Sequence, residues 1–156
     1  MFPDEIIRER NAGEIRCGFT SCRYPDERTV ASKFGLNNRD CLLKEVARNV
    51  AEKIVEALLW KDMAYQCELL SQDKARELAH RFMEAFPWDA HFFTNGNWHE
   101  YPDMDGWNPW TSATFDGGVL AVSERLSGCL WVEDEDCVPA NGKSKQLTLA
   151  HSARAA

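Results

Sequence analysis

The sequence predicts an α+β protein, in which an antiparallel helix pair packs on one face of a small, mainly antiparallel β-sheet. Two observations lead to this prediction. Apolar residues recur at spacings of three and four through residues 39–86, and runs typical of strands occupy residues 113–134. A chain of 156 residues fits one domain, which we assign to residues 1–138. Residues 139–156 are small, polar and basic, so we expect a partly disordered extension there.

The helix pair is expected at about residues 39–70 and 72–86. Leu43, Val50 and Ile54 lie on one apolar stripe of the first helix, whose opposite face is charged. Ser71 is suited to cap the second helix. Pro87 ends that helix, because proline disfavours helical geometry in the residue before it. Two amphipathic helices joined by a short connection pack antiparallel, with both stripes in the core.

The sheet is expected to contain a hairpin with strands at 113–123 and 128–134. Both faces of the second strand are apolar, which indicates an interior strand of the sheet. Gly117-Gly118 in the first strand predicts a bulge or a close approach of another group to the backbone. At least one more strand is needed. The alternation of Ile15 and Phe19 with polar residues favours a strand near the N-terminus, and the tail is the alternative source.

The segment from Phe86 to Phe115 holds nine of the chain's seventeen aromatic residues. Glycine, proline and asparagine interrupt residues 87–112 so often that we expect an ordered, irregular, aromatic-walled loop. Pairing Val122 with Cys129 would place Asp116 opposite Glu135. The acidic end of the hairpin would then lie beside the exit of this loop.

Charge is distributed unevenly along the chain. The net charge is −7, and residues 87–138 carry ten acids and one base. A basic face is absent, so we expect no nucleic-acid partner. No apolar run approaches the length of a membrane span, and the N-terminus does not resemble a secretory signal, so we expect no membrane partner and a cytoplasmic protein. Glycine-rich phosphate loops and metalloprotease motifs are also absent, and we expect no cofactor.

These patterns predict a recognition site that combines aromatic and acidic side chains. Aromatic faces attract cations, and nearby carboxylates strengthen that attraction. The candidate binding residues are Trp88, Trp98, Tyr101, Asp103, Asp105, Trp107, Trp110, Asp116, Trp131, Glu133 and Glu135. The corresponding function is a non-catalytic binding protein, similar in charge character to an inhibitor or immunity protein, that meets a basic protein or a cationic small molecule.

Other functions are compatible with the same residues. The loop at 87–112 could roof a small-molecule or catalytic pocket, with His91 or His99 pointing into it. The aromatic face could form a homodimer. The carboxylates around Asp103, Asp105 and the hairpin end could coordinate a divalent metal, but a solvated strand end that blocks edge pairing explains them better, and we predict no metal site. No pair of histidine, cysteine or carboxylate residues has a spacing diagnostic of catalysis.

Overall fold

The computed structural model describes residues 2–21, 26–37, 42–97 and 106–135. Within these ranges the elements follow one another along the chain. They are α1 (Phe2–Arg10), β1 (Glu14–Thr20), α2 (Glu27–Lys33), β2 (Lys44–Val46), α3 (Arg48–Trp60), α4 (Gln72–Glu84), β3 (His91–Thr94), β4 (Gly96–Asn97), β5 (Gly106–Trp107), β6 (Phe115–Val122) and β7 (Ser127–Asp134). The predicted α+β class is therefore confirmed.

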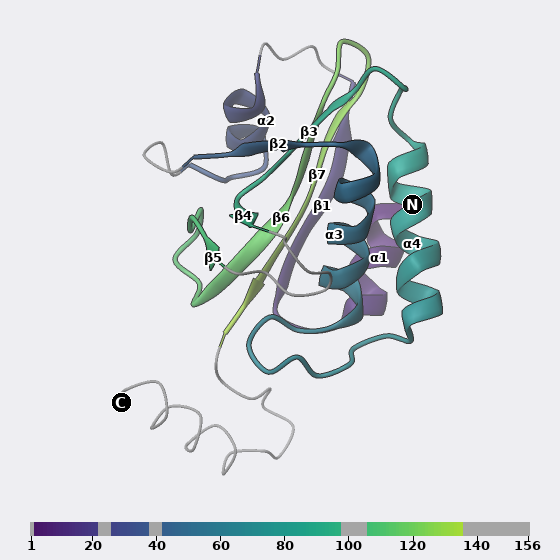
Figure 1. Ribbon diagram of the computed structural model, residues 1–156, viewed down its shortest axis with the longest axis vertical. Helices are drawn as coiled ribbons and strands as arrows, with labels where there is room; N and C mark the ends of the chain where they lie inside the picture. The colour runs from purple at the N-terminus through teal and green to yellow at the C-terminus, as the bar shows by residue number, and fades with distance from the viewer. Residues whose placement is uncertain (1, 22–25, 38–41, 98–105, 136–156) are drawn as a thin grey trace.

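Five strands form one antiparallel sheet in the order β1-β7-β6-β3-β2, and β4 and β5 form a separate small ladder. Figure 1 shows α1, α3 and α4 on one side of the sheet and α2 on the other. The expected interior position of β7 is confirmed, because β1 and β6 flank it. The additional strand comes from the N-terminal region, as the alternation in residues 15–19 indicated.

Two apolar clusters lie on opposite faces of the sheet. Leu130 and Val132 of β7 point into the larger cluster, with the side chains of α1, α3 and α4. Cys129 and Trp131 of the same strand point into the smaller one, with Trp110 and residues from α2. This division follows the two-residue period of a strand and explains why both faces of β7 are apolar. None of the helices in the described ranges is long and apolar enough to span a membrane.

The helix pair is present but shorter than predicted. Residues 44–46 form β2 instead of the first helical turn, because they pair with Phe92–Thr94 of β3 at the sheet edge. Residues 61–70 are irregular, since the Asp62 carboxylate accepts hydrogen bonds from the backbone N–H groups of Ala64, Tyr65 and Cys67. Such side-chain bonds compete with helix formation. Ser71 caps α4 as expected, through its hydroxyl and the Lys74 N–H.

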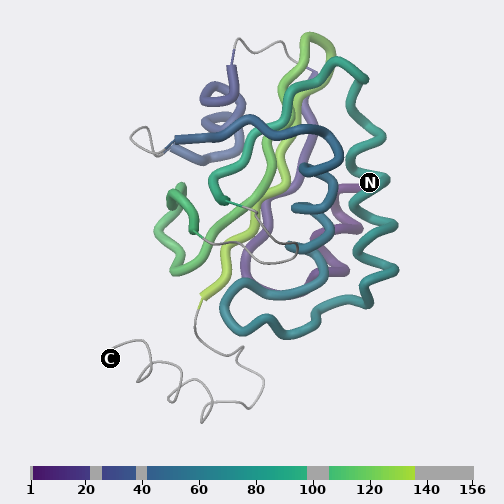
Figure 2. The backbone as a smooth tube through the Cα atoms, viewed as in Figure 1, coloured from purple at the N-terminus to yellow at the C-terminus, as the bar shows by residue number. Residues whose placement is uncertain are grey.

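The expectation of an irregular loop across 87–112 is wrong for residues 91–94. These residues form β3, which lies between β6 and β2 in the main sheet. Phe92 packs into the larger cluster and Phe93 against the smaller one, so the pair occupies both faces of one strand. Figure 2 shows the connection from α4 to β3 and the β6–β7 turn at one end of the sheet, and the 61–70 connection at the other.

The hairpin register also differs from the prediction. Leu120, not Val122, faces Cys129, so Asp116 lies opposite Glu133 rather than Glu135. The turn keeps the expected four residues but begins one residue earlier, at 123–126, where the Ser123 hydroxyl accepts the Leu126 N–H and donates to the Leu126 carbonyl. No bulge interrupts the pairing at Gly118, but a close approach does occur. A Cβ added there would lie 2.6 Å from the Trp131 ring.

A buried ion pair ties the end of β7 to the helices. The Arg10 guanidinium donates to both carboxylate oxygens of Asp134, at 3.0 and 2.7 Å, and to the carbonyls of Leu58 and Ala12. The Met63 N–H also donates to Asp134. The two charged side chains are 0% and 4% exposed. This pair therefore joins α1, α3, the 61–70 connection and β7 on one face of the sheet.

Candidate functional site

Three carboxylates lie side by side across neighbouring strands at the end of the sheet away from the β6–β7 turn. Glu133 of β7 pairs in register with Glu14 of β1 on one side and with Asp116 of β6 on the other. We call Glu14, Glu133 and Asp116 the acidic row. Directly paired residues of antiparallel strands share a face, with Cβ atoms about 5 Å apart. The row therefore places like charges opposite one another, an arrangement that opposes folding.

Arg16 supplies positive charge to the row. Its guanidinium donates to a carboxylate oxygen of Glu133 at 3.0 Å and to the Phe34 carbonyl at 3.1 Å. Arg16 shares a face of β1 with Glu14, because the two residues are two positions apart. Glu135, which is exposed, accepts a hydrogen bond of 2.6 Å from the Thr114 hydroxyl just beyond this end of the hairpin. Negative charge thus exceeds positive charge in this part of the surface.

The carboxylates of Glu14 on β1 and Glu133 on β7 influence each other's ionisation. The hydrogen bond to Glu133 and the charge of Glu133 raise the pKa of Glu14. Burial opposes ionisation of Glu133, but hydrogen bonds from Glu14 and Arg16 outweigh it and keep the pKa of Glu133 below its usual value. When the pKa values of two neighbouring carboxylates move apart in this way, the pair holds one proton between them more readily than two isolated carboxylates would. A cation placed beside them would favour the fully ionised pair.

Asp116 forms the buried end of the row. Its carboxylate accepts hydrogen bonds from the backbone N–H groups of Trp110 and Thr111, at 2.8 and 2.5 Å, and from the Asn95 amide at 3.0 Å. Burial raises the pKa of Asp116, although the Thr111 hydroxyl and the two backbone amides oppose the rise. The Asp116 oxygens hold the start of β6 and the preceding segment together through these hydrogen bonds. Asp116 is buried, so it supports the site and contributes no exposed surface to it.

The predicted aromatic residues separate into different environments. Trp110 and Trp131 are buried in the smaller apolar cluster, so they belong to the core. Trp107 is half-buried, and its ring packs on Phe115 with the centroids 5.4 Å apart. Trp88 is 87% exposed but lies next to the start of β3, at the Val122 end of the sheet, away from the acidic row. Trp98, Tyr101, Asp103 and Asp105 lie outside the described residues.

The sequence reasoning did not identify Glu14, Arg16 or Asn95 as members of the site. Glu14 and Arg16 occupy the polar face of the predicted N-terminal strand, so their alternation was visible. Their proximity to Glu133 depends on the β1–β7 pairing, which no local pattern specifies. Within the described ranges, no three histidine, cysteine, aspartate or glutamate side chains are arranged to hold a metal ion.

Comparison with known proteins adds nothing to this geometry. No family model, curated protein or solved structure matches the chain.

Proposed function

We propose that the chain is a non-catalytic binding protein whose acidic row, together with Glu135, receives a cationic group of a basic protein or small molecule. The observation that carries this proposal is the position of Glu133, which has a carboxylate in register on each side. Sheets ordinarily favour opposite charges at such pairs. A row of like charges costs folding free energy, and a bound cation would remove that cost.

The distribution of charge over the chain supports the same proposal. Ten acids and one base lie within residues 87–138, and the whole chain carries a net charge of −7. A field of one sign raises the local concentration of oppositely charged partners and accelerates their association. That acceleration falls as salt increases, because the screening length shortens to about 8 Å near physiological ionic strength.

The chemistry of the nearby thiols favours binding over nucleophilic catalysis. Burial raises the pKa of Cys17 to about 12. Burial also raises the pKa of Cys129 well above its usual value. A thiol acts as a nucleophile in its deprotonated form, so these two groups of the sheet are inert near neutral pH. Asp116 is likewise occupied by two backbone amides and a side-chain amide.

The proposal can be tested with an oligo-arginine peptide as the probe and its citrulline counterpart as the neutral control. Calorimetric titration should give saturable binding of the arginine peptide that weakens between about 50 and 300 mM salt. The double variant Glu14→Gln/Glu135→Gln should weaken this binding by about threefold to tenfold, since each exposed ion pair contributes up to about fivefold. It leaves the Arg16–Glu133 ion pair in place.

The matched control removes two carboxylates from the far side of the molecule. Asp73 and Glu84 on α4 have side chains that are 95% and 67% exposed. The variant Asp73→Asn/Glu84→Gln changes the net charge by the same amount and should leave binding within about twofold of the unaltered protein. Equal losses in the two double variants would show that the peptide responds to overall charge, and the acidic row would then not be a binding site.

A further inference from the structure

β1 forms one edge of the main sheet. It pairs with β7 through residues Glu14–Thr20, and no strand within the described ranges pairs with its other side. The opposite edge is β2, which has three residues and carries Lys44 and Glu45. Short, charged edge strands resist pairing with another chain, whereas long and weakly charged ones favour it. β1 has seven residues, of which Glu14 and Arg16 are charged.

The backbone of β1 directs alternate residues toward this open side. The Gly18 carbonyl oxygen lies on the β7 side, because a Cβ added to Gly128 of β7 would be 2.8 Å from it. Along an antiparallel strand, the N–H and C=O groups of successive residues point to opposite sides. The backbone groups of Ile15, Cys17 and Phe19 therefore point away from β7. Among the described residues, these groups have no backbone partner outside the β1–β7 ladder.

The side chains of the same three residues carry the larger apolar cluster out to the edge. Ile15, Cys17 and Phe19 are half-buried and pack against that cluster. Burial and the charge of Asp4 raise the pKa of the Cys17 thiol, so the Asp4 side of α1 lies near the middle of β1. Ile7 follows one helical turn later and is 39% exposed. Apolar surface therefore remains partly open to solvent where the sheet ends.

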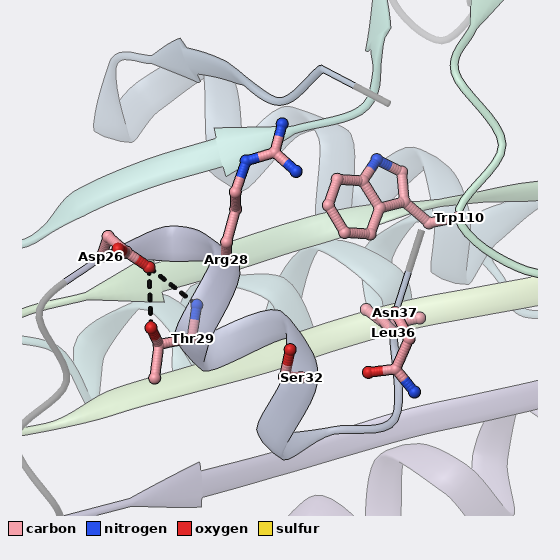
Figure 3. A pocket seen from close by; sticks show the side chains of 7 residues that line it. All are labelled: Asp26, Arg28, Thr29, Ser32, Leu36, Asn37 and Trp110. Carbon is pink, nitrogen blue, oxygen red and sulfur yellow. Dashed lines mark hydrogen bonds between the residues drawn. The ribbon is translucent and has the colours of Figure 1, made fainter. Parts of the chain in front are cut away.

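The groove beside α2 offers a partner less than this edge does. Leu36 and Trp110 in its lining are 0% and 4% exposed, so their apolar surface is already covered. Figure 3 shows the Asp26 carboxylate hydrogen-bonded to the N–H and hydroxyl of Thr29, both at 2.8 Å. The Arg28 guanidinium lies 5.6 Å from the centroid of the Trp110 ring. The groove is thus engaged within the protein, whereas the outer backbone of β1 is open.

We propose that β1 pairs with β1 of a second copy, antiparallel and across a twofold axis at Cys17, so that two five-stranded sheets join into one. Twofold symmetry makes every other contact occur twice. This register pairs all seven residues of each strand. Cys17 lies opposite its own counterpart and Ile15 lies opposite Phe19. The outward-pointing backbone groups then meet, and each of these pairs exchanges two N–H···O bonds.

Charge and side-chain pairing favour a second copy as the occupant of this edge. Glu14 lies opposite Thr20 and Arg16 opposite Gly18, so no two like charges are directly opposed. The repeated contact of Ile15 with Phe19 extends the larger apolar cluster across the junction. A basic peptide, in contrast, would find a single acid, Glu14, among the seven residues of β1. One strand pair is a small interface, so we expect a dissociation constant of about 50 μM.

Sedimentation velocity from about 10 to about 500 μM, with a reducing agent present, tests the association. It should show a reversible equilibrium between monomer and dimer. Each copy carries a net charge of −7, so raising the salt from about 50 to 300 mM should strengthen the dimer by about twofold to fivefold. The oligo-arginine peptide should respond to salt in the opposite direction, so failure of either proposal is recognised separately. A monomer throughout this range would overturn the dimer.

Amide hydrogen exchange of the unaltered protein identifies the strand that pairs. With a dissociation constant of about 50 μM, the monomer fraction falls from about 80% to about 20% between 10 and 500 μM. The N–H groups of Ile15, Cys17 and Phe19 should therefore exchange about fourfold more slowly at the higher concentration. Those of Arg16 and Gly18, which point to β7, should not change. A dimer without slower exchange at the first three residues would contradict the assignment.

Variants at the two ends of β1 test the register. Thr20→Glu places a carboxylate opposite Glu14 at two symmetric positions and should weaken the dimer by about threefold to tenfold. Thr20→Lys should strengthen it, and Glu14→Lys/Thr20→Lys should weaken it again. The control Lys53→Gln, at an exposed position of α3, changes the net charge by the same amount as Thr20→Glu and should alter dimerisation by less than about twofold. Equal effects of Thr20→Glu and Lys53→Gln, or of Thr20→Glu and Thr20→Lys, would exclude this register.

Discussion

The buried Arg10–Asp134 pair gives the strongest prediction about stability. The Asp134→Asn variant keeps the shape of the side chain but removes its charge. The Arg10 guanidinium would then remain in a site where its side chain is 0% exposed, without a counter-ion. Leaving one partner of a buried pair uncompensated costs about 3–5 kcal/mol. A domain of ordinary stability has about 5–15 kcal/mol in total, so this single change would remove a large share of it.

Urea denaturation followed by far-ultraviolet circular dichroism measures this cost through the midpoint and slope of the transition. The neighbouring variant Glu135→Gln is the control, because Glu135 is exposed and its loss should change stability by about 0.5 kcal/mol or less. Arg10→Met should cost about as much as Asp134→Asn, since it leaves the buried Asp134 carboxylate without a counter-ion. The double variant Arg10→Met/Asp134→Leu should cost less than the sum of the two single changes.

A decrease of less than about 1 kcal/mol in the free energy of unfolding of Asp134→Asn would refute this reasoning, because a buried guanidinium without its counter-ion is more destabilising than that. Strict additivity in the double variant would do the same. Either result would mean that the two groups do not form the direct contact through two hydrogen bonds of 3.0 and 2.7 Å.

Three further predictions follow from other contacts. Glu14→Gln should raise the melting temperature at neutral pH and leave it unchanged near pH 3. The raised pKa of Glu14 means that ionisation of this carboxyl opposes folding. The loss of stability begins as pH rises through the unfolded-state pKa of Glu14 and is complete above its folded-state pKa. An unchanged melting temperature of Glu14→Gln at pH 7 would contradict this prediction. Gly118→Ala should cost about 1–3 kcal/mol in urea denaturation, because its Cβ would lie 2.2 Å from a backbone oxygen of β7, whereas Gly106→Ala, with nothing within 4 Å, should be tolerated. Arg48→Met should cost about 2 kcal/mol by the same assay, because Arg48 donates to the carbonyls of Met83 in the last turn of α4 and of Phe86 and Pro87 beyond it. Its guanidinium also lies 5.0 Å from the Phe92 ring, and a loss below about 0.5 kcal/mol would exclude that role.

Local patterns were sufficient for the elements whose period is long or whose caps are distinct. The stripe of α4, its Ser71 cap and the doubly apolar β7 all have signals within their own residues. Phe92 and Phe93 also formed a short apolar run bounded by Pro87 and Asn95, which is consistent with a buried strand. The density of glycine, proline and asparagine around that run favoured a loop, and the pairing of β3 with both β2 and β6 outweighed it.

The candidate site depended on information that a single sequence does not contain. The acidic row requires the β1–β7 register, which joins residues more than one hundred positions apart. The predicted hairpin register was displaced by two residues, and such a shift preserves the face of every side chain while changing its partner. Asp116 was therefore assigned to the correct face but opposite Glu135 instead of Glu133. Its burial depends on the amides of Trp110 and Thr111, which loop geometry alone determines.

The acidic run at the end of β7 illustrates how a strand divides residues that look alike in the sequence. Side chains alternate between the two faces, so Asp134 points toward Arg10 and the helices while Glu133 points toward Glu14 and Asp116. The first carboxylate is neutralised in the core, and the second belongs to a row with excess negative charge. The charge of Asp134 consequently stabilises the fold, whereas the like charges beside Glu133 in the acidic row oppose folding. Removing the charge of Asp134 should remove a large share of the stability of the domain, whereas removing that of Glu14 should relieve repulsion within the acidic row and weaken the binding of cations.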